Sequence, residues 1–211
     1  MLRGVTWNLF LAVIPVLLGL VVAWGLRRRG KDPNLPIWLT LPLMLVWLAF
    51  LPNTCYLLTE WRHLLYDQRW ARLLDAGQQD AGAMLSVARW SLFFLLYSAA
   101  GVLTFGLAVR PVDRALRSTG FRPVLAAPFL FFLVALGVYL GLRARFNSWD
   151  FVTDPLPIWE RTVGAFRSRE VLSAVAAFGG VLWLIYLVVD VWVEGFLARL
   201  RQLGVIGGPK G

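Results

Sequence analysis

The sequence predicts an all-α protein, a polytopic transmembrane bundle of five spans with short interfacial helices. Two properties of the composition indicate this class: the mean hydropathy is +0.67, and only 16% of the 211 residues are charged. A soluble domain of this length needs about 25% charged residues to cover its surface. The third observation is a series of five apolar runs, each of about 20 residues, which is the length that crosses a bilayer as a helix. The lipid bilayer is therefore the first expected partner.

The five apolar runs are expected to form one integral membrane domain over residues 1–211. The predicted spans are 7–26, 37–58, 90–109, 123–142 and 171–192. The first run is longer than the core of about 7–15 residues in a signal peptide, and no small-residue cleavage site precedes the basic segment that follows it. We therefore expect it to remain as a spanning helix.

The positive charge of the chain indicates an orientation in the membrane rather than a nucleic-acid partner. The formal net charge is +9, but the Arg residues are scattered between apolar spans and form no continuous basic face. The connections after spans one and three, together with the C-terminal tail, carry eleven Lys and Arg against four acids, and the other side carries ten against eight. The positive-inside rule then predicts an outside N-terminus and a cytoplasmic C-terminus.

The connections that follow spans two and four are expected to lie on the same side of the membrane. Residues 60–89 interleave Trp and Leu with Arg and Asp, which predicts a helix along the interface and then a Gly-containing turn. Residues 146–170 begin as a loop broken by Asp154-Pro155 and recover as a short amphipathic helix at 158–166. Residues 110–122 are expected to be a basic loop. The sequence names no protein partner.

A polar stripe leaves the second span in "LPNTCYLLTEWRHL". On a helix, one face carries Asn53, Tyr56, Glu60, His63 and Asp67. Pro42 and Pro52 interrupt this span, and Asn53 and Thr54 are expected to bond carbonyls that the prolines leave without donors. A polar stripe at membrane depth should face protein or water, because facing lipid costs several kcal/mol.

The expected partner of the stripe is "RARFNSWD", at the end of span four. Arg143 and Arg145 are donors for Glu60 or for lipid phosphate. Asn147, Ser148 and Asp150 add short polar side chains, and Asn147 or Ser148 is expected to cap the next helix, while Trp149 suits the headgroup region. Gly137-x-x-x-Gly141 in span four predicts close helix packing within the monomer.

Together, the two motifs resemble the bacterial membrane proteins of domain-of-unknown-function family 1361. The positions that carry the resemblance are Leu51, Pro52, Asn53, Tyr56, Thr59, Glu60, His63, Asn147, Ser148, Trp149 and Asp150. Glu60 stands where the family has Asp more often, and Cys55 stands where it has a second Pro. The resemblance implies a multi-pass protein of the bacterial cytoplasmic membrane, and it implies no biochemical activity.

Three functional interpretations remain open. Glu60, His63 and Asp150 could be the catalytic acid and base, or the ligands of a divalent metal, in a hydrolase or transferase acting on a lipid-like substrate. Alternatively, these residues with Arg143 and Arg145 form a structural network that joins spans two and four. The residues expected either to bind substrate or to belong to this network are Asn53, Tyr56, Arg143, Arg145, Asn147, Ser148 and Trp149. A third interpretation is a small transporter or proton relay, since ionisable residues within membranes often mark a pathway. Asp190 is expected to pair with a basic residue at the cytoplasmic face.

Overall fold

A computed structural model describes residues 2–32, 38, 40–59, 68–144, 146 and 148–205. Within these ranges the chain forms helices joined by turns and short connections, without a strand, which confirms the predicted all-α class. The helices are α1 (Leu2–Lys31), α2 (Leu41–Phe50), α3 (Pro52–Thr59), α5 (Gln68–Gly77), α6 (Ala81–Ser118), α7 (Pro123–Ala144), α8 (Asp150–Thr153), α9 (Pro155–Arg167) and α10 (Arg169–Gln202).

Five helical segments are long and apolar enough to cross a membrane, and each contains or overlaps one predicted span. They are Val5–Lys31, Leu41–Thr59, Ala81–Ser118, Pro123–Arg143 and Arg169–Gln202. Large apolar side chains on their outer surfaces are exposed rather than packed, including Leu125 and Val191 at 79% and 72%. In a bilayer such side chains contact lipid. The fold is therefore that of a multi-pass membrane protein.

The second span is divided into α2 and α3 at Leu51–Pro52, where the sequence predicts a departure from regular helix. Thr54 Oγ1 donates to the Leu51 carbonyl at 2.8 Å, whereas the carbonyl that Pro52 leaves without its helical donor is that of Leu48, so this bond is not the one expected for Thr54. Pro42 does not interrupt the span, contrary to the prediction. It lies in the first turn of α2, where the helix requires no backbone donor.

The helix α6 is longer than predicted at both ends. Asp80 caps its start by accepting from the Gly82 and Ala83 amides at 3.2 and 2.8 Å. Its other end continues through Pro111 to Ser118, so the predicted basic loop over 110–122 is wrong for most of its length. Helical spacing through this segment lets Arg110 and Arg114 reach acids on α10, and these ion pairs favour continuation of the helix.

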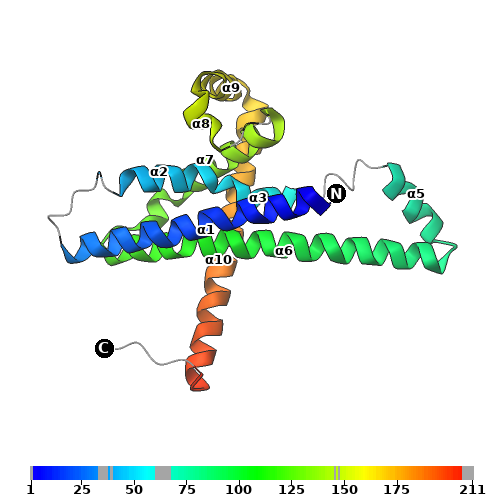
Figure 1. The fold of residues 1–211 in the computed structure, drawn as a ribbon, viewed down its shortest axis with the longest axis horizontal. Helices are drawn as coiled ribbons and strands as arrows, with labels where there is room; N and C mark the ends of the chain where they lie inside the picture. The colour runs from blue at the N-terminus through cyan, green and yellow to red at the C-terminus, as the bar shows by residue number, and fades with distance from the viewer. Residues whose placement is uncertain are drawn as a thin grey trace.

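Helix α6 contacts most of the other spans. Helices α1 and α3 pack against α6, α2 packs against α1, and α10 packs against both α6 and α7. In Figure 1, α1, α2, α3 and α6 lie along the long axis of the molecule, while α10 crosses this direction steeply. The ring of Phe131 on α7 lies 5.9 Å from Phe105 on α6 and 5.7 Å from Tyr186 on α10, measured between centroids. These rings belong to a buried apolar cluster that draws residues from all five spans.

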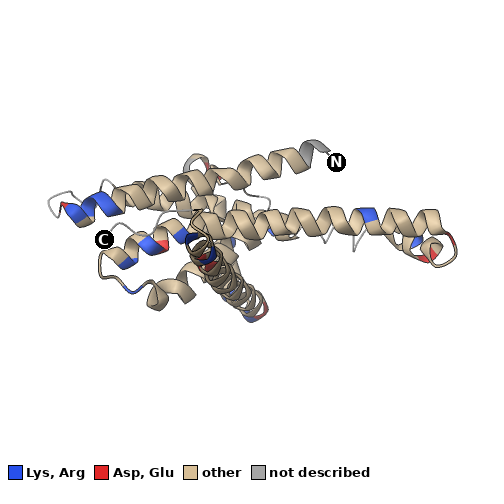
Figure 2. Cartoon of the chain, turned by 90° about the horizontal axis from the view of Figure 1, so that it is seen from below, with Lys and Arg blue, Asp and Glu red and all other residues tan. Residues whose placement is uncertain are grey.

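One end of α1 and α6 collects basic residues, and we call it the basic end. The last turn of α1 carries Arg28, Arg29 and Lys31, which Figure 2 shows in blue at the end away from the N-terminus. A Cβ placed on Gly30 of α1 would lie 3.8 Å from Thr119, just beyond α6, so the two helices end together. From this end α2 and α7 both begin, and they lead away from it.

The shorter helices follow the predicted pattern where the structure describes them. Helix α5 lies at the far end of α6 in Figure 1, buries none of its residues, and is followed by a turn at Gln78–Gln79. Helix α9 covers the predicted segment 158–166 and buries Ile158 and Ala165. Both connections therefore contain the helices expected from their amphipathic patterns.

Candidate functional site

A hydrogen bond joins the two sequence motifs. Asn53 at the start of α3 donates through Nδ2 to the Ser148 hydroxyl at 2.9 Å, across 95 positions of the chain. The Asn53 side chain is almost fully buried, with 5% of its surface exposed. The predicted contact between the polar stripe and the "NSWD" segment is therefore present at this pair. We call Pro52, Asn53, Tyr56 and Ser148 the polar junction.

Two glycines of α7 hold the polar junction in place. A Cβ on Gly137 would lie 2.5 Å from the Cγ atom of Pro52, and one on Gly141 would overlap the hydroxyl of Tyr56. Only a residue without a side chain permits this approach, because a Cβ would displace α3 from α7. The Gly137-x-x-x-Gly141 motif therefore serves packing within the monomer, as the sequence predicts.

The opposite face of α3 packs on α6. A Cβ on Gly101 of α6 would lie 2.9 Å from the Leu57 Cβ atom and 3.2 Å from the Thr54 carbonyl oxygen. Thr54 and Cys55 are fully buried, and the Thr54 Oγ1 and Cys55 Sγ atoms lie 3.7 Å apart. Because α3 is enclosed by α6 on one side and α7 on the other, the stripe begins against protein rather than lipid.

The remaining predicted site residues divide into two groups. Arg143 is exposed in the last turn of α7, Trp149 is 42% exposed, and Asp150 is half-buried as the first residue of α8. Glu60, His63 and Asp67, with Arg145 and Asn147, lie outside the described residues. The roles predicted for Glu60, His63 and Asp150 therefore stay predictions.

Ser148 does not cap the helix that follows it. Trp149 occupies the N-cap position of the one-turn helix α8 and makes no side-chain cap hydrogen bond. The Ser148 hydroxyl instead accepts from Asn53. The sequence predicted a cap by Asn147 or Ser148. The Ser148 oxygen accepts from the distant Asn53 amide, which short-range sequence rules do not consider, and Asn147 lies outside the described residues.

The described residues contain no group of three His, Cys, Asp or Glu side chains that could hold a metal ion. Two of the three predicted ligands, Glu60 and His63, lie outside that part of the chain, so the proposed ligand set of Glu60, His63 and Asp150 is not tested there.

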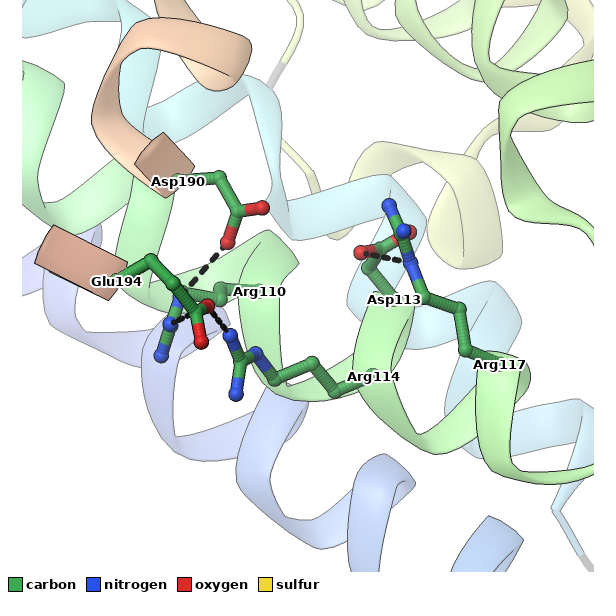
Figure 3. A network of polar contacts seen from close by, with 6 residues as sticks. All are labelled: Arg110, Asp113, Arg114, Arg117, Asp190 and Glu194. Carbon is green, nitrogen blue, oxygen red and sulfur yellow. Dashed lines mark hydrogen bonds and ion pairs between the residues drawn. The ribbon is translucent and has the colours of Figure 1, made fainter. Parts of the chain in front are cut away.

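A second polar cluster lies nearer the basic end, and most of it escaped the sequence analysis. Arg110 of α6 donates to Asp190 of α10 at 2.8 Å and to Glu194 at 3.0 Å, and Arg114 also pairs with Glu194. Figure 3 shows these four side chains converging between the two helices. The expected pairing of Asp190 with a basic residue is confirmed. The sequence did contain a signal for this cluster: Arg110 and Arg114 are four residues apart on one helix, and Asp190 and Glu194 are four residues apart on the other.

The relationship of the chain to known proteins rests on a family comparison. The family model described as "Protein of unknown function (DUF1361)" matches residues 7–185. The chain belongs to this family. The matched range includes both motifs that suggested DUF1361, and it ends before Asp190 and Glu194. No curated protein and no solved structure matches the chain.

Proposed function

We propose that this DUF1361 protein acts at the outer face of the bacterial cytoplasmic membrane, where the polar junction joins span two to the segment after span four. The hydrogen bond from Asn53 to Ser148 is the observation that supports the proposal. Asn53 is buried at membrane depth, and an amide left without a partner there would cost several kcal/mol. The hydrogen bond in the junction offsets this cost and fixes the position of α3. Glu60 and His63 follow this helix in the sequence.

The orientation follows from the position of the junction relative to the basic end. The chain runs from Thr40, beside Gly25 of α1, through α2 to α3, so the junction lies away from the basic residues. Cytoplasmic connections carry an excess of Lys and Arg, which assigns the basic end to the cytoplasm. The N-terminus and the junction then face outward, and the C-terminus faces inward.

Labelling of single cysteines tests this orientation. In a Cys55→Ala background, Thr153→Cys at the end of α8 should react with a membrane-impermeant maleimide in intact cells. Thr119→Cys, the matched change at the basic end, should react only after permeabilisation. Both threonines are exposed and bond only carbonyls of their own helical segments. The reverse labelling pattern contradicts the proposed orientation.

A double-mutant cycle tests the junction itself. Asn53→Ala and Ser148→Ala should show a coupling free energy of about 0.5–2 kcal/mol when equilibrium unfolding is measured in detergent micelles. Ser86→Ala is the matched control, because the Ser86 hydroxyl is exposed and bonds only the Gly82 carbonyl of its own helix. Asn53→Ala and Ser86→Ala should be additive, and additivity of Asn53→Ala with Ser148→Ala refutes the junction.

A second candidate function is a membrane-embedded hydrolase or transferase for a lipid-like substrate, in which Glu60, His63 and Asp150 are the acid and base or bind a divalent metal. The same contact favours it, because Asp150 follows Ser148 by two residues and Glu60 directly follows α3. Metal analysis of the purified protein beside a His63→Ala variant tests the metal version. Equal metal content in the two proteins contradicts it, and transport stays a prediction from the sequence.

A further inference from the structure

An apolar cavity lies between four spans, on the basic-end side of the polar junction. Its volume is about 320 Å³, which falls within the range of about 300–1,000 Å³ for small-molecule sites. Helix α2 contributes Trp47 and Leu48, α7 contributes Ala127 and Leu130, and α10 contributes Trp183. Exposed side chains such as Phe129, at 67%, also line it, so the cavity opens on the surface that faces lipid.

Polar groups in the cavity lining are limited to a few side chains. Asp113 of α6 is buried and accepts from Arg117 Nε at 2.9 Å, and both residues line the cavity. Figure 3 shows this pair apart from the cluster formed by Arg110 and Arg114. The Arg117 side chain is 57% exposed, and its Nη1 and Nη2 atoms make no hydrogen bond to the described residues. Arg117 therefore has donors that can bind an anion.

Tyr186 of α10 adds a second polar group. This residue lines the cavity, and its buried hydroxyl lies beside the Asp113 carboxylate without a hydrogen bond of normal geometry to any described residue. A buried hydroxyl whose hydrogen bond is not well formed is costly, and a ligand carbonyl that reached it from the cavity would accept its proton. The exposed Arg122 lies between Phe121 and Pro123, which both line the cavity, so a further positive charge borders its opening.

We propose that this cavity binds one acyl chain of an anionic phospholipid. The apolar lining accepts the chain, the Tyr186 hydroxyl donates to the ester carbonyl, and the lipid phosphate lies against Arg117 and Arg122. The charge favours an anionic headgroup, because the Asp113 carboxylate is already paired while Arg122 adds positive charge. This site is distinct from the polar junction and does not depend on its function.

The test compares two phospholipids that share the same acyl chains, phosphatidylglycerol and phosphatidylcholine. The purified full chain is titrated with each lipid, and retained lipid is counted by native mass spectrometry. One phosphatidylglycerol should remain bound at concentrations at which phosphatidylcholine is lost. Equal retention of both lipids overturns the proposal and indicates ordinary lipid contact.

Three changes locate the site. Ala127→Phe fills the cavity and should weaken phosphatidylglycerol retention at least tenfold, whereas Ala99→Phe, on the exposed surface of α6, should not. Tyr186→Phe should weaken it several-fold, and Tyr97→Phe, in a separate cluster with Ala12 and Leu57, is its matched control. The triple change Asp113→Asn, Arg117→Gln and Arg122→Gln, which removes the pair and the additional positive charge together, should abolish the preference for the anionic lipid.

If the larger side chain in Ala127→Phe prevents folding, the Tyr186→Phe variant still tests the site. The Tyr186 hydroxyl makes no well-formed hydrogen bond to the described residues, so the variant is expected to fold. Unchanged lipid retention in Tyr186→Phe and in the Asp113/Arg117/Arg122 triple variant overturns the site. Dimerisation that is lost in Ala127→Phe, without a lipid effect, identifies a second copy as the occupant and also overturns it.

Discussion

Arg110 of α6 donates its Nε proton to the Oδ1 atom of Asp190 on α10 over 2.8 Å. The side chains are 13% and 25% exposed, and Arg110 also donates through Nη2 to Glu194 at 3.0 Å. The two carboxylates of α10 are thus matched by two guanidinium groups of α6, since Arg114 also pairs with Glu194. Because the Arg110 and Asp190 charges are largely removed from water, the loss of one of these two partners leaves an uncompensated charge.

Replacement of Arg110 by Met should therefore lower the free energy of unfolding by about 3 kcal/mol, measured by equilibrium unfolding in detergent micelles. The double change Arg110→Met and Asp190→Leu should recover part of this loss, because no unpaired Asp190 charge remains. Arg114→Met is the control: its side chain is 42% exposed and its pairing with Glu194 should contribute less than about 1 kcal/mol. Equal losses in the two single variants contradict the assigned importance of Arg110.

Gly141→Ala should separate α3 from α7. The new Cβ overlaps the Tyr56 ring, so either the ring or the helix must move, at a cost of about 1–3 kcal/mol. Tyr56→Ala in the same chain removes the obstacle and should make Gly141→Ala close to neutral. Gly164→Ala on α9 has open space around the new Cβ and serves as the control. The packing is contradicted if Gly141→Ala lowers the free energy of unfolding equally in the chain with Tyr56 and in the Tyr56→Ala chain.

Adjacent glycines in α10 provide a matched comparison. A Cβ on Gly179 would lie 3.1 Å from the Phe131 carbonyl oxygen of α7, whereas a Cβ on Gly180 meets no atom within 4 Å. Gly179→Ala should therefore lower the thermal midpoint in detergent, because the α7 backbone must shift. Gly180→Ala should leave it unchanged or raise it, since Ala favours helix by about 1 kcal/mol. Similar midpoints for both variants argue against the close crossing.

Trp47→Phe should weaken the contact between α2 and α6. The buried indole of Trp47 donates through Nε1 to the Ala108 carbonyl at 3.1 Å, and Phe offers no donor for that oxygen. The expected loss is about 1 kcal/mol in the free energy of unfolding. Trp38→Phe is the control because Trp38 is 66% exposed. Indistinguishable stabilities of the two variants rule out a structural role for the Trp47 hydrogen bond.

Local sequence properties were sufficient to predict the spans and the break at Pro52. Hydropathy sums over neighbouring residues, and a chain in lipid must satisfy its backbone internally, so long apolar runs become helices. The same reasoning failed at Pro111, where a basic, proline-containing segment resembles a loop. Helix α6 continues there, and its Arg110 and Arg114 side chains pair with α10, which lies some 80 positions away in sequence.

The sequence by itself determined the helical class, the number of spans and the periodic stripe that begins at Asn53, because these depend on spacing and transfer free energy along one helix. The tertiary structure decided which oxygen Asn53 reaches, which glycines admit Pro52 and Tyr56, and where α10 crosses α6. Those contacts depend on the angles and registers at which separate helices meet. No property of a single helix specifies them, since each is the outcome of close packing among all five spans.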